Sequence, residues 1–387
     1  MKIAFIGQKG IPAKTGGIER YTENLAINLA GEGHEVLLYS RYYYSQGIKQ
    51  YKGVRIISVP SLKSKNLEAI TNTFFACLDL AFRKVDIINF QAIGPASLIW
   101  LIKILKPGTP VVFTFHCQDY YHQKWGGFAR WYLKLGEKIG CRFADKVIVT
   151  SRVLQDYVKN TYQLAAEYIP YGAATPEKIE VSSIRRWGLE KNNYIVSIGR
   201  LVRHKGVHYL IEAFKQTTTD KKLVIVGEAA HTADYAAELM ALAKNDERII
   251  FTGNQTGRDL KELFSNAYLF VQPSEYEGLS VALLEAMGFG LACLVSNISQ
   301  NEEAVATNGL TFENKNVNDL KEKLNFLINN PNETERFGRA ALARVKQEYN
   351  WPKVTAAITS CFAETIKNDK FTKDKFSNTK IVPLKVN

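Results

Sequence analysis

The fold of this chain is decided by residues 2–40, which read KIAFIGQKGIPAKTGGIERYTENLAINLAGEGHEVLLYS. Residues 2–7 form an apolar run that is typical of a buried strand, and residues 35–40 form a second one. Between them, apolar side chains recur at helical spacing over 17–31. A strand, a helix and a strand in this order predict a βαβ unit with parallel strands.

The same alternation continues to residue 150 and starts again after the turn-rich junction 169–173. In the first half we expect further strands over 54–59, 86–90, 111–116 and 146–150, and helices over 67–84 and 128–143. In the second half we expect strands over 194–199, 222–227, 249–252, 267–272 and 294–296, and helices over 206–215, 232–243, 258–267 and 280–289.

These two series predict an α/β protein with two Rossmann-like, doubly wound parallel-sheet domains that face a central cleft. The expected boundaries are 1–171 for the first domain and 172–350 for the second. A helix over 351–367 is expected to return to the first domain, and residues 368–387 to form a basic, mobile tail. Open parallel sheets bind ligands at the carboxyl ends of their strands, so we sought candidate site residues there.

Length and composition agree with this organisation. At roughly 150 residues per domain, 387 residues suffice for two. The hydrophobic fraction of 46% and the charged fraction of 23% exclude a disordered, collagen-like or coiled-coil chain. No stretch approaches the roughly 18 apolar residues of a membrane span, and the first apolar run is too short for a secretory signal, so we expect a cytoplasmic protein. Five widely spaced cysteines without a C-x-x-C pair are interpreted as reduced, buried thiols.

Positive charge is concentrated in the first half of the chain. The net charge is +12, and residues 1–173 hold 22 Lys and Arg against 12 Asp and Glu, whereas residues 174–366 hold 22 against 24. A basic half predicts an anionic partner, which could be nucleic acid, an anionic lipid surface or a phosphorylated substrate. The alternative interpretation is a basic surface without a specific partner.

A glycine-containing loop follows the first strand of each domain. The first loop ends in Gly16-Gly17 and opens a helix, so that backbone N–H groups could face an anion at close range. It is not a dinucleotide fingerprint, because Lys9 stands where G-x-G-x-x-G needs a glycine. In the second domain, Gly199-Arg200 and Lys205-Gly206 bring two cations to a strand end, which suits a diphosphate. The alternatives are a plain strand–helix loop and a solvated basic loop.

The most specific motif is the segment 273–290, which reads PSEYEGLSVALLEAMGFG. Glu277 lies at the entry to a helix, and Glu285 lies about two turns further, with seven residues between them. The N–H groups of residues 278–280 would point at an anion. A carboxylate within an apolar helix needs hydroxyl or cationic partners, and sugar hydroxyls are suited to this. The alternative is a helix-capping carboxylate plus a surface glutamate.

His116 ends the strand 111–116 at the edge where ligands are expected, although a lone histidine is more often a satisfied core or surface residue. Asp119 lies close by in the sequence, but no Ser/His/Asp order accompanies the pair. Neither H-E-x-x-H nor D-x-D occurs, so we expect neither a metal ion nor another cofactor.

Taken together, the loop ending in Gly16-Gly17, the segment from Gly199-Arg200 to Lys205-Gly206 and the pair Glu277-x7-Glu285 resemble the motifs of glycosyltransferase family 4, of GT-B fold. The resemblance covers roughly residues 1–366. It implies an enzyme whose first domain receives the acceptor and whose second domain holds a nucleotide-sugar. It also implies transfer with retention of the anomeric configuration and without a metal. The sequence departs from the family where Glu277-Gly-Leu-Ser280 stands in place of Glu-Gly-Phe-Gly.

The resemblance implies a role for each candidate residue. Arg200 and Lys205 would bind the donor diphosphate and stabilise the leaving group. Glu277 would contact the donor sugar, Glu285 would hydrogen-bond the ribose, and His116 would face the reacting sugar. The remaining nucleotide-sugar-binding residues, whose backbone would approach the phosphates or the acceptor, are Gly16, Gly17, Gly278, Leu279 and Ser280.

Two segments are similar to a narrower group, the bacterial polysaccharide-assembly transferases, several of which move rhamnose. These segments are 6–19 and 124–137, KWGGFARWYLKLGE. The similarity implies a rhamnosyltransferase, and the basic first domain fits a lipid-diphosphate-linked saccharide acceptor at an anionic membrane surface. The second segment contains aromatic side chains interleaved with basic ones. They could form a membrane-facing stripe, or the aromatic side chains could pack into the core. The aromatic residues are Trp125, Phe128, Trp131 and Tyr132, and the basic ones are Lys124, Arg130 and Lys134.

Three other classes of protein remain as alternatives. An NAD-dependent oxidoreductase would share the α/β sheets, but its fingerprint is missing here. A nucleotide-sugar epimerase of GT-B fold would share the whole architecture. A non-enzymatic protein that binds anions or nucleic acid would explain the charge, but the basic residues are scattered and form no RNA- or DNA-binding motif, so no nucleic-acid partner is expected.

Overall fold

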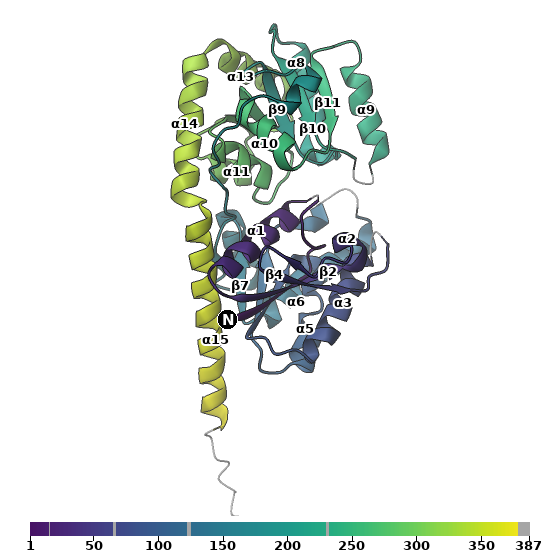
Figure 1. Ribbon diagram of the computed structural model, residues 1–387, viewed down its shortest axis with the longest axis vertical. Coiled ribbons are helices and arrows are strands. Elements are labelled where there is room, and N and C mark those ends of the chain that lie inside the picture. Colours follow the sequence, from purple (N-terminus) through teal and green to yellow (C-terminus); the bar gives the residue numbers. More distant parts are fainter. Residues whose placement is uncertain (15, 65–66, 122–124, 230–231, 378–387) are drawn as a thin grey trace, which may run out of the picture.

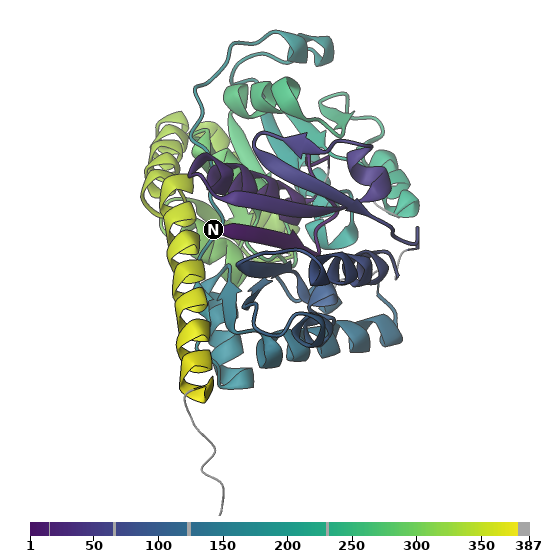
Figure 2. The ribbon, with the colours of Figure 1, turned by 60° about the horizontal axis from the view of Figure 1, so that its bottom comes forward.

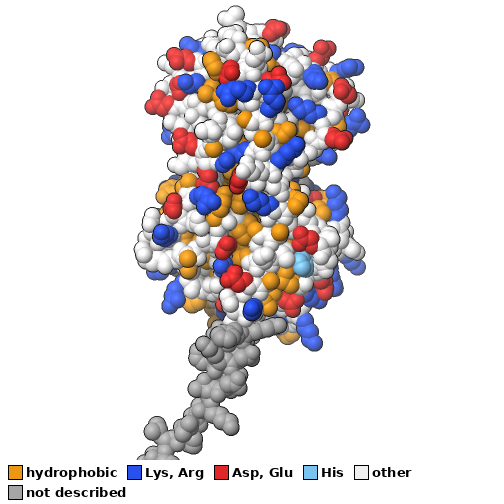
Figure 3. Space-filling model, turned by 90° about the vertical axis from the view of Figure 1, so that its left-hand side faces the viewer, with side chains coloured by type: hydrophobic (Ala, Val, Ile, Leu, Met, Phe, Trp, Pro, Cys, Tyr) orange, Lys and Arg blue, Asp and Glu red, His pale blue; other side chains and the backbone are white. Residues whose placement is uncertain are grey.

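The computed structural model describes residues 1–14, 16–64, 67–121, 125–229 and 232–377. Two α/β domains lie end to end, and the last two helices run along one side of both (Figure 1). Seen from that side, the molecule narrows between the domains, and Lys and Arg side chains are interspersed with Asp and Glu (Figure 3). This confirms the predicted fold class of two parallel-sheet α/β domains.

Within the described residues, the first domain is built on an eight-stranded sheet in the order β3-β4-β2-β1-β5-β6-β7-β8. Every neighbouring pair is parallel except the hairpin of β3 and β4, and β1 pairs with β2 and β5 through Ile3, which lies opposite Val36 and Ile87. The strands are β1 (Lys2–Ile6), β2 (Glu35–Arg41), β3 (Gln50–Tyr51), β4 (Val54–Val59), β5 (Ile87–Gln91), β6 (Val111–Phe115), β7 (Lys146–Val149) and β8 (Glu167–Tyr168).

Helices cover both faces of this sheet, because successive strand residues point to opposite sides. Phe5 of β1 packs in the cluster that includes α1 and α15, whereas Ile6 packs in the cluster that includes α3, α5, α6 and α7. The helices are α1 (Gly17–Gly31), α2 (Tyr42–Ser45), α3 (Glu68–Ala81), α4 (Ile93–Ala96), α5 (Ile99–Leu105), η1 (Asp119–Tyr121), α6 (Gly127–Phe143) and α7 (Arg152–Tyr162).

In the part of the chain that is described, the second domain has a six-stranded, fully parallel sheet in the order β11-β10-β9-β12-β13-β14. The first strand of the series, β9, lies in the middle, as in a doubly wound fold. The strands are β9 (Tyr194–Ile198), β10 (Lys222–Val226), β11 (Ile249–Gly253), β12 (Leu269–Gln272), β13 (Ala292–Ser296) and β14 (Leu310–Phe312).

Helices cover both faces of the second sheet. The helices α8, α9 and α13 pack on one face, and α10 and α11 pack on the other. The elements are η2 (Ser183–Trp187), η3 (Arg203–Lys205), α8 (Val207–Lys215), α9 (Ala233–Ala243), α10 (Gly257–Asn266), α11 (Val281–Gly288), α12 (Ser299–Val305), α13 (Val317–Asn329), α14 (Pro331–Glu348) and α15 (Trp351–Ser377).

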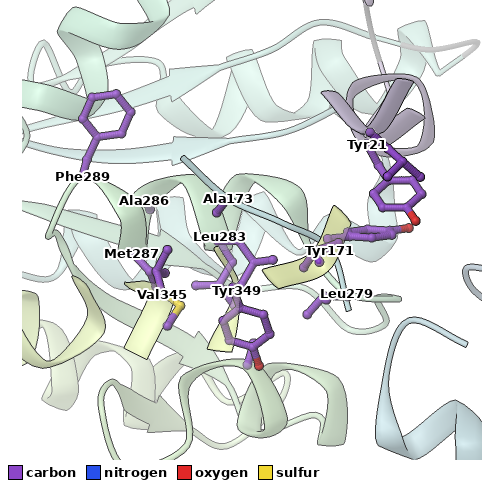
Figure 4. Packing of buried hydrophobic residues seen from close by; sticks show 14 of the residues in the cluster. Tyr21, Tyr171, Ala173, Leu279, Leu283, Ala286, Met287, Phe289, Val345 and Tyr349 are labelled. Atoms are coloured by element: carbon purple, nitrogen blue, oxygen red, sulfur yellow. The ribbon is translucent and has the colours of Figure 1, made fainter. Parts of the chain in front are cut away.

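The chain passes between the domains twice, and the two passages lie side by side. The N–H of Ala173 donates to the carbonyl of Tyr349 at 2.6 Å, and Gly172 lies so close to the ring of Trp351 that an added Cβ would come within 2.4 Å of it. One hydrophobic cluster also runs from the first domain into the second, and Figure 4 shows its members Tyr21 and Tyr171 with their rings side by side. The two domains therefore share a continuous core.

The last helix lies against the first domain. Thr359 Oγ1 of α15 donates to Glu32 Oε2, just beyond α1, at 3.1 Å, and Figures 1 and 2 both show α15 running along that domain. The helix was expected to end at residue 367, but it continues to Ser377. Neither Gly nor Pro occurs between Pro352 and Ser377, so no residue in this range is expected to interrupt the helix. Of the expected mobile tail, 368–377 is therefore helical, and 378–387 lies outside the described residues.

Candidate active site

The predicted site residues follow strands whose carboxyl ends face the other domain. Gly16 and Gly17 follow β1, and His116 directly follows β6. In the second domain, Arg200 and Lys205 follow β9, and the segment 277–280 follows β12. Parallel strands end at one edge of a sheet, so each domain presents its candidates on a single side.

Three contacts show that these two edges meet. A Cβ added at Gly278 would lie 2.6 Å from the carbonyl oxygen of His116, and one added at Gly17 would lie 3.5 Å from Val281 Cγ2. The N–H of Gln118 also donates to the Tyr276 hydroxyl at 3.1 Å. The backbone approach at residue 278 is so close that only glycine fits there without a shift of one domain.

Glu277 and Lys205 form an ion pair at this interface. The carboxylate is nine-tenths buried, and Ser274 Oγ also donates to Glu277 Oε1 at 2.6 Å. The short η3 turn holds Lys205 in place, because Gly206 adopts φ +66° and packs on the backbone carbonyl of Pro273. The buried carboxylate thus has a cation and a hydroxyl as partners.

The helix α11 begins at Val281, shortly after Glu277. The hydroxyl of Ser280 caps it by accepting from the N–H of Leu283 at 3.4 Å, and it donates to Gln272 Oε1 at 2.6 Å. Ser280, the departure from the family pattern, is thus used for capping. Among the described residues, no acceptor takes the N–H groups of Gly278 and Leu279, so these donors remain available to an anion.

Glu285 lies further along α11 and contacts the first domain. Arg20 Nε of α1 donates to Glu285 Oε1 at 3.0 Å, and both side chains are partly exposed. A hydroxyl or a cation is the expected partner of Glu285, but the sequence does not identify Arg20 as that cation. The two residues are 265 positions apart, so no local pattern links them.

Arg200 is exposed and lies near the first domain. Burial is the main cause that raises the pKa of the Cys117 thiol, with the charges of Asp119 and Glu277 adding to it and that of Arg200 opposing it. Arg200 and Glu277, on the second domain, thus lie close enough to Cys117, on the first domain, for their charges to affect its thiol. The two predicted cations, Arg200 and Lys205, therefore both stand close to where the domains meet.

His116 does not present its ring to the interface in this structure. The side chain is buried, with Nε2 at 2.6 Å from Gln91 Oε1 and Nδ1 at 2.7 Å from the Tyr171 hydroxyl. Burial lowers the pKa of His116 to about 3, so the ring is neutral at ordinary pH. Because Gln91 Oε1 can only accept, Nε2 carries the proton and donates to it, and Nδ1 accepts from the Tyr171 hydroxyl. The backbone carbonyl, rather than the ring, is the part of His116 next to Gly278.

A side chain of the protein itself covers part of the expected ligand position at the start of α1. Gly16 is the N-cap of α1 with φ +98°, and the Glu19 carboxylate folds back over it and accepts from the N–H of Lys9 at 3.2 Å. An acidic side chain in the first turn satisfies the positive helix end. The sequence predicts a ligand at this helix end but gives no sign of the contact with Glu19.

The described residues were also compared with three other kinds of site: a surface hollow, a metal centre and a membrane span. A shallow hollow at the edge of the first sheet contains none of the predicted residues and is lined by Asp145, Lys146, Glu364, Thr365, Asn368 and Asp369. In the part of the chain that is described, no three His, Cys, Asp or Glu side chains gather in a way that could hold a metal ion. No helix there is long and apolar enough to cross a membrane.

Curated relatives match over much of the chain. An uncharacterized glycosyltransferase of Methanocaldococcus jannaschii is 24% identical over 353 residues, which covers 90% of this chain and 95% of that protein. The alpha-maltose-1-phosphate synthase of Mycobacterium tuberculosis is 32% identical over 185 residues, or 44% of this chain and 48% of that protein. An O-antigen chain mannosyltransferase of Salmonella typhimurium is 29% identical over 186 residues, or 47% and 50%.

Solved structures share the architecture. The sucrose-phosphate synthase of Thermosynechococcus elongatus superimposes with a TM-score of 0.82 at 21% identity, covering 95% of this chain and 99% of that one. The Anabaena protein HepE, solved in complex with UDP and glucose, gives a TM-score of 0.79 at 19% identity, covering 94% and 100%. These likenesses show the fold.

Family models match both domains. Residues 15–175 match Glycosyltransferase Family 4, and residues 182–344 match Glycosyl transferases group 1. The two matches meet at the passage between the domains, and they confirm the resemblance seen in the motifs. The chain therefore belongs to the glycosyltransferases of GT-B fold, with a family 4 domain followed by a group 1 domain.

Proposed function

We propose that this glycosyltransferase moves a sugar from a nucleotide-diphosphate-sugar to a lipid-linked saccharide during bacterial cell-surface polysaccharide synthesis. The observation that carries the proposal is the meeting of Lys205, Glu277 and the unpaired N–H groups of Gly278 and Leu279 at the domain interface. A cation and two amides suit a diphosphate, and a carboxylate suits sugar hydroxyls. HepE, of the same fold, was solved with UDP and glucose, which supports a nucleotide-sugar donor.

The chemical demand on such a site is charge stabilisation. As the bond from the anomeric carbon to the diphosphate breaks, negative charge grows on the leaving oxygen and positive charge on the sugar ring. Lys205 and Arg200 would meet the first charge and Glu277 the second, since fixed charges at the reacting atoms stabilise charge as it develops. The present ion pair of Lys205 with Glu277 holds both side chains at the interface until a substrate provides other partners.

We further propose that transfer retains the anomeric configuration and needs no metal ion. The resemblance supports attack on the face that the diphosphate leaves, with a diphosphate oxygen helping to deprotonate the acceptor hydroxyl. Glu277 as a covalent nucleophile is the alternative route to retention. A covalent route would give a glycosyl-enzyme detectable by mass spectrometry of a trapped reaction, and the route proposed here would not.

The sugar and the acceptor are proposed from the narrower resemblance. Rhamnose is the proposed sugar because segments 6–19 and 124–137 resemble those of polysaccharide-assembly transferases. The O-antigen chain mannosyltransferase among the relatives supports a role in surface polysaccharide synthesis and points to mannose as a second candidate sugar.

A surface on α6 supports docking at an anionic membrane. Phe128 and Trp131 lie on its first turns, exposed by 79% and 57%, with ring centroids 5.7 Å apart. The solvent face of the helix also carries exposed Arg130, Lys134, Lys138 and Arg142. Amphipathic helices with aromatic and cationic side chains on one face bind anionic interfaces.

The expected aromatic stripe is thus only half exposed. Trp125 packs against the core, and the hydroxyl of Tyr132 contacts Ser97 Oγ. Lys124 lies outside the described residues. The only carboxylate of α6, Glu137, is buried and accepts from the Tyr157 and Tyr162 hydroxyls at 2.7 Å each, so it leaves the exposed face cationic.

A thermal-shift screen of nucleotide-sugars tests the donor proposal. A ligand at about 100 times its dissociation constant stabilises the folded state by about 2.7 kcal/mol, which is readily seen as a higher unfolding midpoint. We expect stabilisation by one nucleotide-diphosphate-sugar and by its nucleoside diphosphate. The proposal fails if no member of a panel of uridine, guanosine, adenosine and thymidine diphosphate sugars shifts the midpoint.

Product analysis without an acceptor separates the epimerase alternative. An epimerase would convert the donor into its isomer without an acceptor, whereas the proposed transferase would leave the donor largely intact. Filter binding with a steep salt dependence would instead favour the nucleic-acid alternative.

A further inference from the structure

We propose that Arg20, on the first domain, sets the affinity for the donor by competing with the nucleotide ribose for Glu285. This inference rests on the proposed function, because it takes Glu285 as the residue that binds the ribose. Arg20 is contributed by α1, a helix of the acceptor domain, so it would link the two domains through the donor site.

The contact itself is specific. Arg20 Nε donates to Glu285 Oε1 at 3.0 Å, with side chains that are 32% and 23% exposed. In the described part of the chain, the Glu285 carboxylate has no other hydrogen-bond partner, and the two terminal nitrogens of Arg20 have none. A hydrogen bond between a guanidinium and a carboxylate is about twice as strong as one between neutral groups. Arg20 can therefore compete with a ribose hydroxyl for Glu285.

The two helices that carry this pair lie close together near their starts. A Cβ added at Gly17, one turn before Arg20 on α1, would lie 3.5 Å from Val281 Cγ2, at the start of α11. Arg20 Nε takes one acceptor site of Oε1, so a ribose hydroxyl that donates to this oxygen must share it with the guanidinium or displace it.

The sign of the effect follows from this exchange. Breaking a partly exposed ion pair costs a small amount of free energy, and this cost is subtracted from the donor's binding free energy. Removing the positive charge at position 20 therefore tightens nucleotide binding, by about 2- to 5-fold. Lysine at position 20 can still pair with Glu285, so Arg20→Lys is expected to bind like the wild type.

Calorimetric titration of full-length protein with nucleoside diphosphates tests the inference. The probe is whichever of uridine, guanosine, adenosine or thymidine diphosphate binds the wild type. We expect Arg20→Gln to lower the dissociation constant by about 2- to 5-fold and Arg20→Lys to leave it unchanged. In a Glu285→Gln background, Arg20→Gln is expected to have no effect, because the coupling runs only through that carboxylate.

A second contact between the domains provides the matched control. The Glu303 carboxylate of α12 accepts from the N–H groups of Arg152 at 2.8 Å and Val153 at 3.3 Å, at the start of α7. Glu303→Gln weakens this contact without touching the donor site, and it is expected to leave the dissociation constant unchanged. Equal tightening by Glu303→Gln would show that Arg20 acts by general loosening of the domains, and would overturn the inference.

The remaining outcomes separate this inference from the proposed function. If the wild type binds a nucleoside diphosphate and Glu285→Gln weakens binding, but Arg20→Gln weakens it or leaves it unchanged, the inference is wrong and the proposed function stands. The inference is also wrong if Arg20→Gln tightens binding equally in the Glu285→Gln background. If none of the diphosphates binds the wild type, both fail together.

Discussion

Lys205 and Glu277 are the two residues whose charges the proposed reaction would use most directly. They pair with each other at the domain interface, next to a close backbone approach at Gly278. A donor entering here would separate the pair and give the ammonium a diphosphate and the carboxylate a sugar. The side chains thus need little rearrangement before charge develops, which is the condition for electrostatic stabilisation of a transition state.

Replacing either cation is expected to slow transfer. Lys205→Ala and Arg200→Ala should each lower kcat by about 10²–10³-fold, because each removes a charge aimed at the leaving diphosphate. The measurement is the initial rate of nucleoside diphosphate release with a saturating donor and acceptor. Arg203→Ala is the matched control, since Arg203 lies in the same η3 turn but pairs with Glu238 at the surface. Near-wild-type rates for both Lys205→Ala and Arg200→Ala would refute the assignment.

The buried His116 is expected to make stability depend on pH. Its pKa is about 3 in the folded protein and 6.5 when unfolded, so the unfolded chain binds one more proton between these values. Stability is therefore fully present above pH 6.5 and falls by up to about 1.4 kcal/mol per pH unit as the pH drops towards 3. Urea unfolding from pH 7 to 4.5 should show a smaller slope for His116→Gln than for the wild type. Equal slopes would mean that His116 is protonated in the fold.

At the residue scale, the sequence predicted where candidate site residues lie, but not which residues hydrogen-bond to them. The strand ends locate Arg200, Lys205 and Glu277, because a strand followed by a helix is a local pattern. The partners Arg20 and Tyr171 are 265 and 55 positions away from Glu285 and His116, and only the assembled fold brings them together. The ring of His116, which is predicted to face the reacting sugar, has both of its nitrogens hydrogen-bonded, to Gln91 and Tyr171.

At the scale of elements, the helix α6 combines two tasks. Its inner face packs in the core of the first domain through Leu133 and Cys141, and its outer face carries exposed aromatic and cationic side chains. The short η1 helix precedes it, and Tyr121 of η1 packs against Tyr276 of the second domain, with tilted rings whose centroids are 5.4 Å apart. An α6 surface at a membrane would therefore bring the domain interface close to a lipid-linked acceptor.

Removing the exposed aromatics of α6 is expected to weaken membrane binding. Each buried aromatic side chain contributes about 1.5–3 kcal/mol, so Phe128→Ala with Trp131→Ala should lower partition onto anionic vesicles at least about 10-fold. Cosedimentation with phosphatidylglycerol vesicles at low salt measures this. Phe326→Ala, an exposed aromatic on α13 of the second domain, serves as control. Negligible cosedimentation of the wild type would remove the membrane proposal altogether.

Long periodic elements were predictable, whereas short or polar ones were not. The helix α1 occupies 17–31 as expected, because its apolar positions repeat regularly. The two-residue strands β3 and β8 carry too few residues to show an alternation. The polar composition of residues 368–377 suggested a tail, but none of these residues breaks a helix. The helix α15 therefore continues past its expected end.

At the scale of the whole molecule, the site depends on how closely the domains approach. Both passages of the chain lie on one side, at Ala173 and Tyr349, and the core cluster continues across them. The candidate residues lie at the meeting edges, so a small change in domain orientation would alter the distance between the cations and the first domain. The sequence predicted two parallel sheets whose edges face each other. It did not predict how closely the two domains approach at these edges.

Adding one methyl group at the interface is expected to impair catalysis without unfolding a domain. Gly278→Ala would place a Cβ 2.6 Å from the His116 carbonyl oxygen, so the domains must move apart. A displacement of about 1 Å can cost about 10²-fold in rate, and we expect kcat/KM to fall by about that factor. Gly126→Ala is the control, since its Cβ would meet nothing within 4 Å. An unchanged kcat/KM for Gly278→Ala would show that the domains work further apart than they lie here.

The proposed transfer from a nucleotide-sugar is tested most directly by a time course of donor consumption with and without an acceptor. Purified protein is incubated with the stabilising nucleotide-sugar and a lipid-diphosphate-linked saccharide, and both nucleoside diphosphate and glycan mass are followed. We predict equimolar release of nucleoside diphosphate and extension of the glycan by one sugar, only when the acceptor is present and about 10²–10³-fold more slowly with Lys205→Ala. Release or isomerisation of the donor at the same rate without acceptor, or a Lys205→Ala variant as fast as the wild type, would contradict it.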